Sequence, residues 1–227
     1  MSDFTFLTVE QVFEDEKLEI LKKYGTKCAI TDFAILLGGS VAQSIYTSEG
    51  VSRKNRTGKW WTKYSRNSGA SIVDLPGWYY FRSIRRRSIG GRPVLPYKLI
   101  PVSSLNKAKV QNGVLEVEYG EYPQTVVSEE LAIILENKYI NKSISLKSTG
   151  KYYTTDSFVK DVHSDVKMEF QPRQHMEYEY NSKKYVRLIG DYDGKETILS
   201  NGKNISYYEP YWIEVEPIKW MIDMKNE

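Results

Sequence analysis

The sequence predicts an α+β fold that is mostly antiparallel β with two or three helices. Short segments of alternating apolar and polar residues recur along the chain, and turn pairs such as Asn112-Gly113 and Asn201-Gly202 separate them. The chain has 227 residues, of which 41% are hydrophobic and 27% charged. A chain of this length buries roughly 70% of its unfolded surface, so it does not need disulfides. We expect a helix plus a basic aromatic β module over 1–105 and a second α+β half over 106–227, packed together into one unit.

Two helices are expected near the amino terminus. Thr8 and Gln11 have the spacing of a capping box, which predicts a helix over 8–24. Thr31 or Asp32 would cap a second, short helix that the following glycine pair ends. The apolar run inside this second segment would suit a buried strand equally well.

A small β meander is predicted in the middle of the first half. The polar, turn-rich residues 51–69 form a loop that leads into a short strand. Strand-like runs follow at 70–73, 77–84 and 92–95, and Pro76-Gly77 predicts a turn between the first two.

Residues 107–165 predict a hairpin, a helix and a loop, in that order. Asn112-Gly113 divides two alternating segments within 107–119, as a type I′ hairpin would. Ser128 would cap a helix that runs to about Lys138. The apolar positions of this helix predict a buried face made of Leu131, Ile134, Leu135 and Tyr139. The polar stretch 141–165 predicts a long ordered loop.

The carboxy-terminal part returns to strands. Alternating apolar residues predict them at 176–180, 184–189, 197–200 and 207–221. In the last of these strands we expect Pro217 to interrupt the pairing, because proline has no backbone N–H. Turns are predicted at Asn181-Ser182, Asp193-Gly194 and Asn201-Gly202.

The positive charge of the protein is concentrated in residues 51–98. The formal net charge is only +3, but this segment holds twelve basic residues against one acid, Asp74. The segment is therefore +11 and the rest of the chain is −8. Either the basic segment pairs internally with the acidic remainder while its aromatic residues form core, or it binds an anionic partner.

Basic side chains interleaved with aromatic rings can follow a phosphate backbone and stack on bases. The candidate residues for contact with an anionic partner are Arg53, Lys54, Arg56, Lys59, Lys63, Arg66, Arg82, Arg85, Arg86 and Arg87. The candidate stacking residues are Trp60, Trp61, Tyr64, Trp78 and Tyr80. If the arginine run is extended, Arg85 and Arg87 would share one face and Arg86 the other.

Three stretches of the chain are similar to one group of domain families. They are Trp60-Trp61-Thr62-Lys63-Tyr64-Ser65, then Gly91-Arg92-Pro93-Val94-Leu95, and finally Glu118–Gln124 taken together with Glu216–Trp220. They resemble motifs of domain families of unknown function that share the formylglycine-generating-enzyme or C-type-lectin-like fold. The resemblance covers about 28–97 and 114–223, with the motif order reversed, as in a permuted arrangement or two partial copies.

This resemblance implies a C-type-lectin-like fold, which is known chiefly for ligand recognition on variable loops. It also implies an origin in gut bacteria and their mobile elements or phages. The copper-binding cysteine pair of the formylglycine-generating enzyme has no counterpart, because Cys28 is the only cysteine. We therefore do not carry over that activity.

The sequence holds no catalytic motif, and we expect no enzyme activity, cofactor or metal. His163 and His175 lie in polar surroundings and are interpreted as solvated, and Cys28 as a small buried residue. Asp191–Gly194 lacks the distal ligands of a calcium loop, so a hairpin turn is favoured there. No window is apolar enough for a membrane span, and Met1–Glu10 lacks the basic region followed by an apolar region that is typical of a signal peptide, so we expect a cytoplasmic protein.

Three functions remain as hypotheses. The first is a non-enzymatic binding protein that engages a nucleic acid, a nucleoprotein or an acidic protein through residues 51–98. In this class, a phage or mobile-element inhibitor of a CRISPR-type defence nucleoprotein would fit both the charge and the resemblance. The second is recognition of a carbohydrate or peptide by exposed Trp and Tyr side chains. The third is a phage structural subunit.

Overall fold

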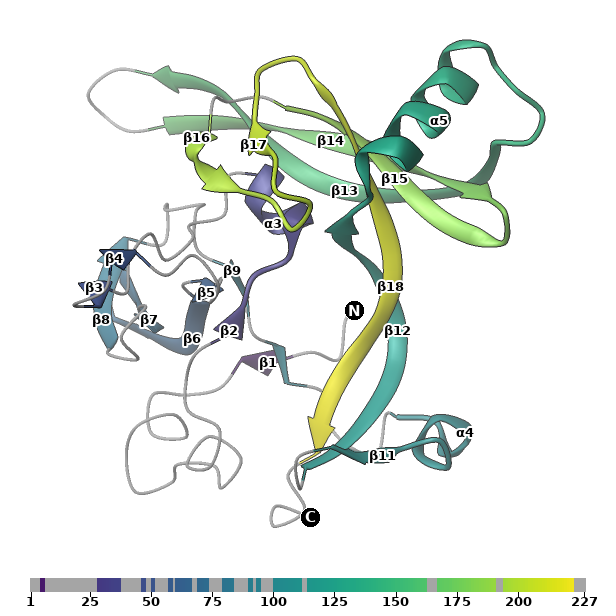
Figure 1. The fold of residues 1–227 in the computed structure, drawn as a ribbon. Helices are drawn as coiled ribbons and strands as arrows, with labels where there is room; N and C mark the ends of the chain where they lie inside the picture. Colours follow the sequence, from purple (N-terminus) through teal and green to yellow (C-terminus); the bar gives the residue numbers. More distant parts are fainter. Residues whose placement is uncertain are drawn as a thin grey trace. The chain divides into compact units, whose positions relative to one another are not determined.

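The computed structural model describes parts of the chain, drawn in colour in Figure 1. The described residues are 5–6, 28–37, 46–47, 50–51, 57–58, 60–66, 69–73, 79–83, 90–91, 93–94, 100–111, 114–162, 167–190 and 194–222. Side chains are described for 30–37, 100–110, 115–155, 172–190 and 198–222. The helix predicted over 8–24 lies outside these residues.

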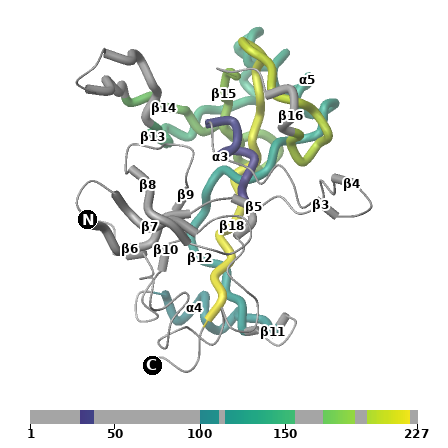
Figure 2. Tube along the Cα trace, turned by 90° about the vertical axis from the view of Figure 1, so that its left-hand side faces the viewer, coloured from purple at the N-terminus to yellow at the C-terminus, as the bar shows by residue number. Residues whose placement is uncertain are grey.

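The chain divides into two compact units. The first comprises Met1–Tyr122 with Pro217–Glu227, and the second comprises Pro123–Glu216. Strands β12 (Val114–Val126) and β18 (Pro210–Ile222) contribute residues to both units. They are neighbours in a six-stranded sheet of order β11-β12-β18-β15-β14-β13, and Figures 1 and 2 both show them side by side.

The first unit contains the predicted meander. Strands β6 (Trp60–Arg66), β7 (Gly69–Val73) and β8 (Tyr79–Ser83) pair antiparallel in sequence order, and β9 (Gly90–Gly91) adds to β6 in parallel. Within the strand predicted at 92–95, the described residues form β10 (Pro93–Val94), which pairs with β1 (Thr5–Phe6). The other elements are β2 (Cys28–Ala29), α3 (Asp32–Leu36), β3 (Tyr46–Thr47), β4 (Gly50–Val51), β5 (Thr57–Gly58), α4 (Val102–Leu105) and β11 (Lys109–Gln111).

The second unit is built on long antiparallel strands with one helix. Its elements are α5 (Glu129–Ile140), β13 (Lys147–Val162), β14 (Lys167–Tyr180), β15 (Lys183–Ile189), β16 (Gly194–Ile198) and β17 (Asn204–Ile205). The end of β12, from Pro123 to Val126, and the first part of β18, from Pro210 to Glu216, also belong to this unit. Three helices occur among the described residues of the whole chain, and antiparallel pairing predominates. The predicted α+β class, mostly antiparallel β, is confirmed.

Turn chemistry explains the hairpins that were predicted. Gln111 pairs with Val114, so only two residues connect β11 to β12, as the Asn112-Gly113 signal requires. Between β14 and β15, Asn181 and Ser182 both have positive φ, at 49° and 60°. Positive φ at both central positions is the geometry of a type I′ turn, whose twist matches the flanking strands.

Side-chain caps explain the two predicted helices that lie within the described residues. The Thr31 hydroxyl accepts a hydrogen bond from the Ala34 N–H at 3.2 Å, and the residues after it form α3, so the helix alternative is correct. The Ser128 hydroxyl accepts from the Leu131 N–H at 3.4 Å at the start of α5. These caps satisfy N–H groups that a helix leaves unpaired in its first turn.

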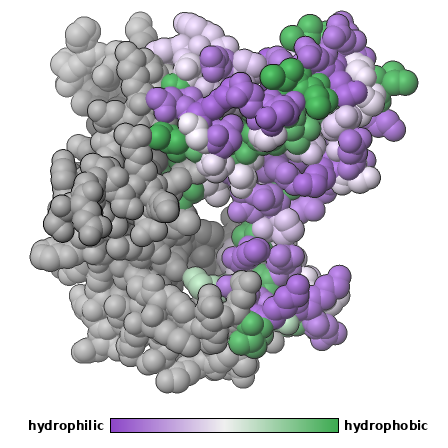
Figure 3. Space-filling view, in the orientation of Figure 1, coloured by the Kyte–Doolittle hydropathy of each residue, from purple (hydrophilic) through white to green (hydrophobic). Residues whose placement is uncertain are grey.

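The buried face predicted for α5 is partly wrong. Leu135 is fully buried, but Ile134 is 43% exposed and Tyr139 is 39% exposed. Figure 3 shows hydrophobic side chains on the surface over this helix, where Ile133 and Ile140 are also exposed. Only Leu135 of α5 belongs to the buried core cluster, and Leu131 and Ala132 pack against it while partly buried, so the buried stripe of the helix is narrower than the apolar pattern indicates.

The loop predicted at 141–165 is wrong, because most of this stretch forms β13. Its tyrosine and threonine residues have high strand propensity despite their low hydropathy. The strand is stabilised by pairing along β14, from Lys147 opposite Glu179 to Val162 opposite Lys167. Most described side chains of β13 are exposed, which is why the stretch lacks the hydrophobic signal of a strand.

Two further expectations need correction near the carboxy terminus. Pro217 does not interrupt β18, which continues to Ile222. The pairing of β18 with β15 ends at Glu214, so Pro217 lies beyond the part of the strand where β15 requires a donor. The strand predicted at 197–200 is shifted, since β16 ends at Ile198 and Asn201-Gly202 lies in the turn that follows it.

The core of the second unit surrounds Trp212. Leu135 of α5 packs with Val127, Tyr185 and Trp212 on one face of the sheet. Val186, which alternates with Tyr185 along β15, is buried on the opposite face. Side chains on both faces of β15 are therefore buried.

Candidate functional site

The structure places part of the basic aromatic segment on adjacent strands. Trp61 of β6 and Tyr80 of β8 are both opposite Ile72 of the central strand β7. Likewise Ser65 and Arg82 are both opposite Ala70. The backbones of the two strands that are rich in candidate residues thus flank one strand, β7, that has no basic residue.

The other candidate residues are placed as follows. Trp60, Lys63, Tyr64 and Arg66 also belong to β6. Outside the described residues lie Arg53, Lys54, Arg56, Lys59, Trp78, Arg85, Arg86 and Arg87. His163 and the Asp191–Asp193 part of the predicted hairpin turn lie outside them as well.

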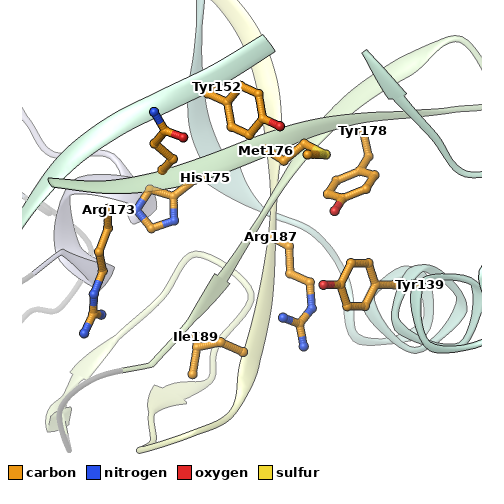
Figure 4. A pocket seen from close by; sticks show the side chains of 9 residues that line it. Tyr139, Tyr152, Arg173, His175, Met176, Tyr178, Arg187 and Ile189 are labelled. Atoms are coloured by element: carbon orange, nitrogen blue, oxygen red, sulfur yellow. The ribbon is translucent and has the colours of Figure 1, made fainter. Parts of the chain in front are cut away.

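A hollow of about 570 Å³ opens on the second unit, where α5 meets strands β13, β14 and β15 (Figure 4). It was not predicted, because its residues come from four elements between positions 139 and 189. The residues that line it are Tyr139, Tyr152, Arg173, Gln174, His175, Met176, Tyr178, Arg187 and Ile189. None of these nine residues is acidic.

Arg187 is held in place by Glu136. The Arg187 Nε donates to Glu136 Oε2 at 2.9 Å, and Nη2 donates to Oε1 at 2.7 Å. The guanidinium also lies over the Tyr139 ring, 4.4 Å from its centroid. Hydrogen bonding from Arg187 lowers the pKa of the Glu136 carboxyl, and the same bond raises the pKa of Arg187. Both groups are therefore charged over a wide pH range, and the guanidinium is fixed against an aromatic wall.

Aromatic rings form that wall. Tyr139 and Tyr178 meet edge to face with centroids 5.7 Å apart, and each also contacts the ring of Trp212 edge to face. Burial raises the pKa of the Tyr178 hydroxyl, so it stays protonated at neutral pH. Tyr152, paired with Met176 across β13 and β14, is 46% exposed.

His175 is less solvated than the sequence indicated. Its side chain is half-buried, and its Nε2 lies 2.7 Å from the hydroxyl oxygen of Thr155 on the neighbouring strand. The polar residues around it in the sequence alternate between the two faces of β14, so they do not describe its surroundings.

A buried carboxylate lies two residues further along β14. Glu177 is 2% exposed and accepts hydrogen bonds from the Tyr153 hydroxyl at 2.7 Å and the Thr149 hydroxyl at 3.0 Å. Burial raises the pKa of Glu177, but these hydrogen bonds and the positive charge of Lys151, 3.6 Å away, outweigh it and hold the pKa below the usual range. This cluster ties β13 to β14 beside the hollow.

The described residues hold no group of three or more His, Cys, Asp or Glu side chains placed to bind a metal ion. No helix among them is both long and apolar enough to cross a bilayer. The chain matches no protein-family model, no curated protein and no solved structure.

Proposed function

We propose that this is a non-enzymatic binding protein that engages an anionic macromolecule through residues 51–98. One observation carries the proposal: the segment with twelve of the basic residues and one acid supplies β6 and β8, the strands on either side of β7. Pairing of this kind gathers charges from separate parts of the segment into one sheet. A local cluster of positive charge attracts phosphate backbones and acidic surfaces.

The ion pairs of the second unit support an external partner. Glu129, Glu136, Glu177 and Glu214 are paired with Lys203, Arg187, Lys151 and Lys183, and all eight residues belong to the second unit. These four carboxylates are satisfied without the basic segment. Fewer acids then remain to neutralise it internally.

The proposed partner is a nucleic acid, a nucleoprotein or an acidic protein in the cytoplasm. Inhibition of a CRISPR-type defence nucleoprotein by a phage or mobile element is the specific case we favour. It rests on the charge of 51–98 together with the family resemblance.

We also propose the C-type-lectin-like or formylglycine-generating-enzyme-like fold for this chain. Support comes from the third motif of the resemblance, whose two halves lie on the neighbouring strands β12 and β18. The Trp220 indole N–H donates to the Tyr119 carbonyl at 2.8 Å, and the Gln124 amide donates to the Glu216 carbonyl at 3.1 Å. These hydrogen bonds join residues about a hundred positions apart in the sequence.

Salt-dependent binding tests the function. The purified protein is first checked for nucleic acid by the ratio of absorbance at 260 and 280 nm, and then titrated against labelled single-stranded RNA, duplex DNA and polyglutamate. We expect affinity to fall steeply between about 50 and 200 mM salt. Replacing Arg85, Arg86 and Arg87 with Ala should weaken binding at least about tenfold and reduce the salt slope by about two to three.

The matched control removes the same charge elsewhere. Lys142, Lys147 and Lys219 are exposed lysines outside the basic segment, and their replacement with Ala should change affinity less than about twofold. The proposal is wrong if none of the three polyanions binds, or if affinity is the same at high and low salt. It is also wrong if the lysine variant loses as much affinity as the arginine variant.

A further inference from the structure

We infer that the hollow on the second unit binds a proline-rich peptide in the extended polyproline II conformation. Every described residue that lines the hollow belongs to Pro123–Glu216, so this site is separate from the basic segment. The inference therefore does not depend on the proposed function. A proline-rich peptide also differs in chemistry from the partner proposed for the basic segment, because it needs no charge to bind.

Three tyrosines give the hollow an aromatic surface. Tyr139 and Tyr152 keep 39% and 46% of their surface exposed. Tyr139 packs edge to face against Tyr178 and Trp212. The Arg187 guanidinium lies 4.4 Å from the centroid of the same ring, so the side chain of Tyr139 has little freedom to turn. Exposed rings that are already fixed bind a ligand at low entropic cost, and aromatic surfaces are the usual docking sites of proline rings.

Apolar side chains continue along the same face of the sheet. Met176 lies opposite Tyr152 across β13 and β14, and Tyr178 shares the face of Met176 because side chains alternate along a strand. Ile189 is 40% exposed at the end of β15. Figure 4 shows Tyr152 and Met176 at the top of the hollow and Ile189 at the bottom. Apolar contacts at several separate points suit a chain of rings better than a single ring.

The polar lining favours a ligand that presents hydrogen-bond acceptors. The Arg187 guanidinium can only donate, and Glu136 accepts two of its N–H groups, which leaves others for a ligand. The Tyr152 hydroxyl and the exposed Gln174 amide are further donors. A proline residue has a carbonyl acceptor but no N–H, and polyproline II has no internal hydrogen bonds. A proline-rich peptide therefore needs donors from its binding site, and these side chains supply them.

An exposed tyrosine pair adjoins the hollow. The backbone of Gly190, which directly follows Ile189, accepts from the Tyr208 N–H at 2.8 Å and donates to the Glu209 carbonyl at 2.9 Å. Tyr207 and Tyr208 are 53% and 84% exposed, and their ring centroids lie 5.9 Å apart. The loop that carries the pair is thus fixed to the end of β15, beside the hollow.

The backbone of Tyr208 indicates that this side chain serves an external ligand. Its φ of +63° is a left-handed conformation, which is unfavourable for a bulky side chain. The side chain is largely exposed, so packing within the fold does not compensate for this strain. Strained residues of this kind cluster at ligand-binding sites. The tyrosine pair extends the aromatic surface of the hollow for a longer peptide.

Calorimetric titration of the full chain with capped peptides tests this site. The probe is decaproline with an acetylated amino end and an amidated carboxyl end, and the comparison is a capped Gly-Ser repeat of the same length. We expect decaproline to bind at least about tenfold more tightly, since its rings contact the tyrosines and its conformation is already formed. Its affinity should change less than about twofold between about 50 and 200 mM salt, because it carries no charge.

Two positions probe the aromatic surface. Tyr152→Ala should weaken decaproline binding about tenfold, and Tyr152→Phe, which keeps the ring but loses the donor, about threefold. Tyr208→Asn should weaken binding at least about threefold but unfold at a temperature no lower than the parent chain, because asparagine tolerates the left-handed conformation. A purely structural role for Tyr208 would instead lower the unfolding temperature.

The control variant is Ile144→Ala, which removes an apolar side chain that is 92% exposed and lies in the second unit outside the hollow. It should change decaproline affinity less than about twofold. Thermal unfolding identifies any variant that fails to fold.

Several results would overturn the inference. Decaproline that binds no better than the Gly-Ser repeat excludes a site for polyproline II. Unchanged affinity in folded Tyr152→Ala and Tyr208→Asn excludes this surface. AMP or a neutral disaccharide that binds more tightly than decaproline, and loses affinity in Tyr152→Ala, would assign the hollow to a nucleotide or a sugar. Loss of decaproline binding when Arg85, Arg86 and Arg87 are replaced would assign the peptide to the basic segment. The polyanion titrations concern that segment alone, so either proposal can fail without the other.

Discussion

Glu136 on α5 and Arg187 on β15 form a two-point ion pair, with N···O distances of 2.9 and 2.7 Å. The same carboxylate accepts the indole N–H of Trp212 on β18 at 2.9 Å. One carboxyl group thus joins the helix to two strands of the sheet. Both charged side chains are mostly buried, with 18% and 21% of their surface exposed, so water cannot readily replace a lost partner.

Glu136→Gln should lower the free energy of unfolding by about 2 kcal/mol, because it leaves a mostly buried guanidinium without its counter-charge. Urea unfolding followed by circular dichroism measures the loss. The control is Lys203→Gln, which breaks the exposed pair with Glu129 and should cost no more than about 0.5 kcal/mol. Equal losses in the two variants would mean that burial adds nothing to the Glu136–Arg187 pair.

Acid should destabilise the second unit. The pKa values of Glu136 and Glu177 are both lowered in the folded protein, so below the ordinary glutamate pKa of about 4.3 the unfolded chain binds more protons than the folded one. Their contribution is complete above that pKa and is lost as pH falls from about 5 through the lowered values. The urea midpoint of the parent protein should therefore fall between about pH 7 and pH 3, and the midpoint of the Glu136→Gln variant should fall less steeply over the same range. If the urea midpoint of Glu136→Gln falls with pH as steeply as that of the parent protein, this prediction is wrong.

Leu135→Ala should cost about 2 to 5 kcal/mol, because Leu135 is fully buried against Tyr185 and Trp212. Ile134→Ala, on the next position of the same helix, should cost less than about 1 kcal/mol, since Ile134 is 43% exposed. Thermal and urea unfolding compare the two. If Ile134→Ala loses more free energy of unfolding than Leu135→Ala, the wider buried face predicted from the apolar pattern is supported instead.

Gly190→Ala should destabilise the end of β15. A Cβ at this position would lie 2.1 Å from the Ser206 carbonyl oxygen, and the Gly190 backbone also bonds to Glu209 and Tyr208, so it cannot easily move. We expect a loss of about 3 kcal/mol or more from this overpacking. Gly150→Ala is the comparison: it meets no atom within 4 Å but has φ +79°, so only backbone strain of about 1 kcal/mol is expected. A milder effect at Gly190 than at Gly150 would refute the steric argument.

Local signals predicted the parts of the fold that local chemistry determines. Ser128 and Thr31 mark helix starts because each side chain bonds an N–H three residues later. Asn181-Ser182 marks a hairpin because its backbone conformation is decided within the turn. Such features need no information from distant residues.

What the sequence did not reveal depends on distant partners. The sequence of β13 predicts a loop, because this strand is stabilised by pairing with β14 and not by burial of its own side chains. The hollow is missed for the same reason, since Tyr139, Tyr152 and Arg187 become neighbours only when the sheet and α5 assemble. The burial of Glu177 has no sequence signal, because its alternating neighbours Met176 and Tyr178 lie on the other face.

The position of Trp212 also gives the second unit its own optical reporter. It is the one tryptophan between residues 123 and 216, it is completely buried, and its indole N–H is bound to a carboxylate. Subtracting the emission spectrum of a Trp212→Phe variant from that of the parent chain isolates the fluorescence of this residue. Loss of packing between α5 and the sheet would then be visible as a red shift of that difference spectrum, separately from events elsewhere in the chain.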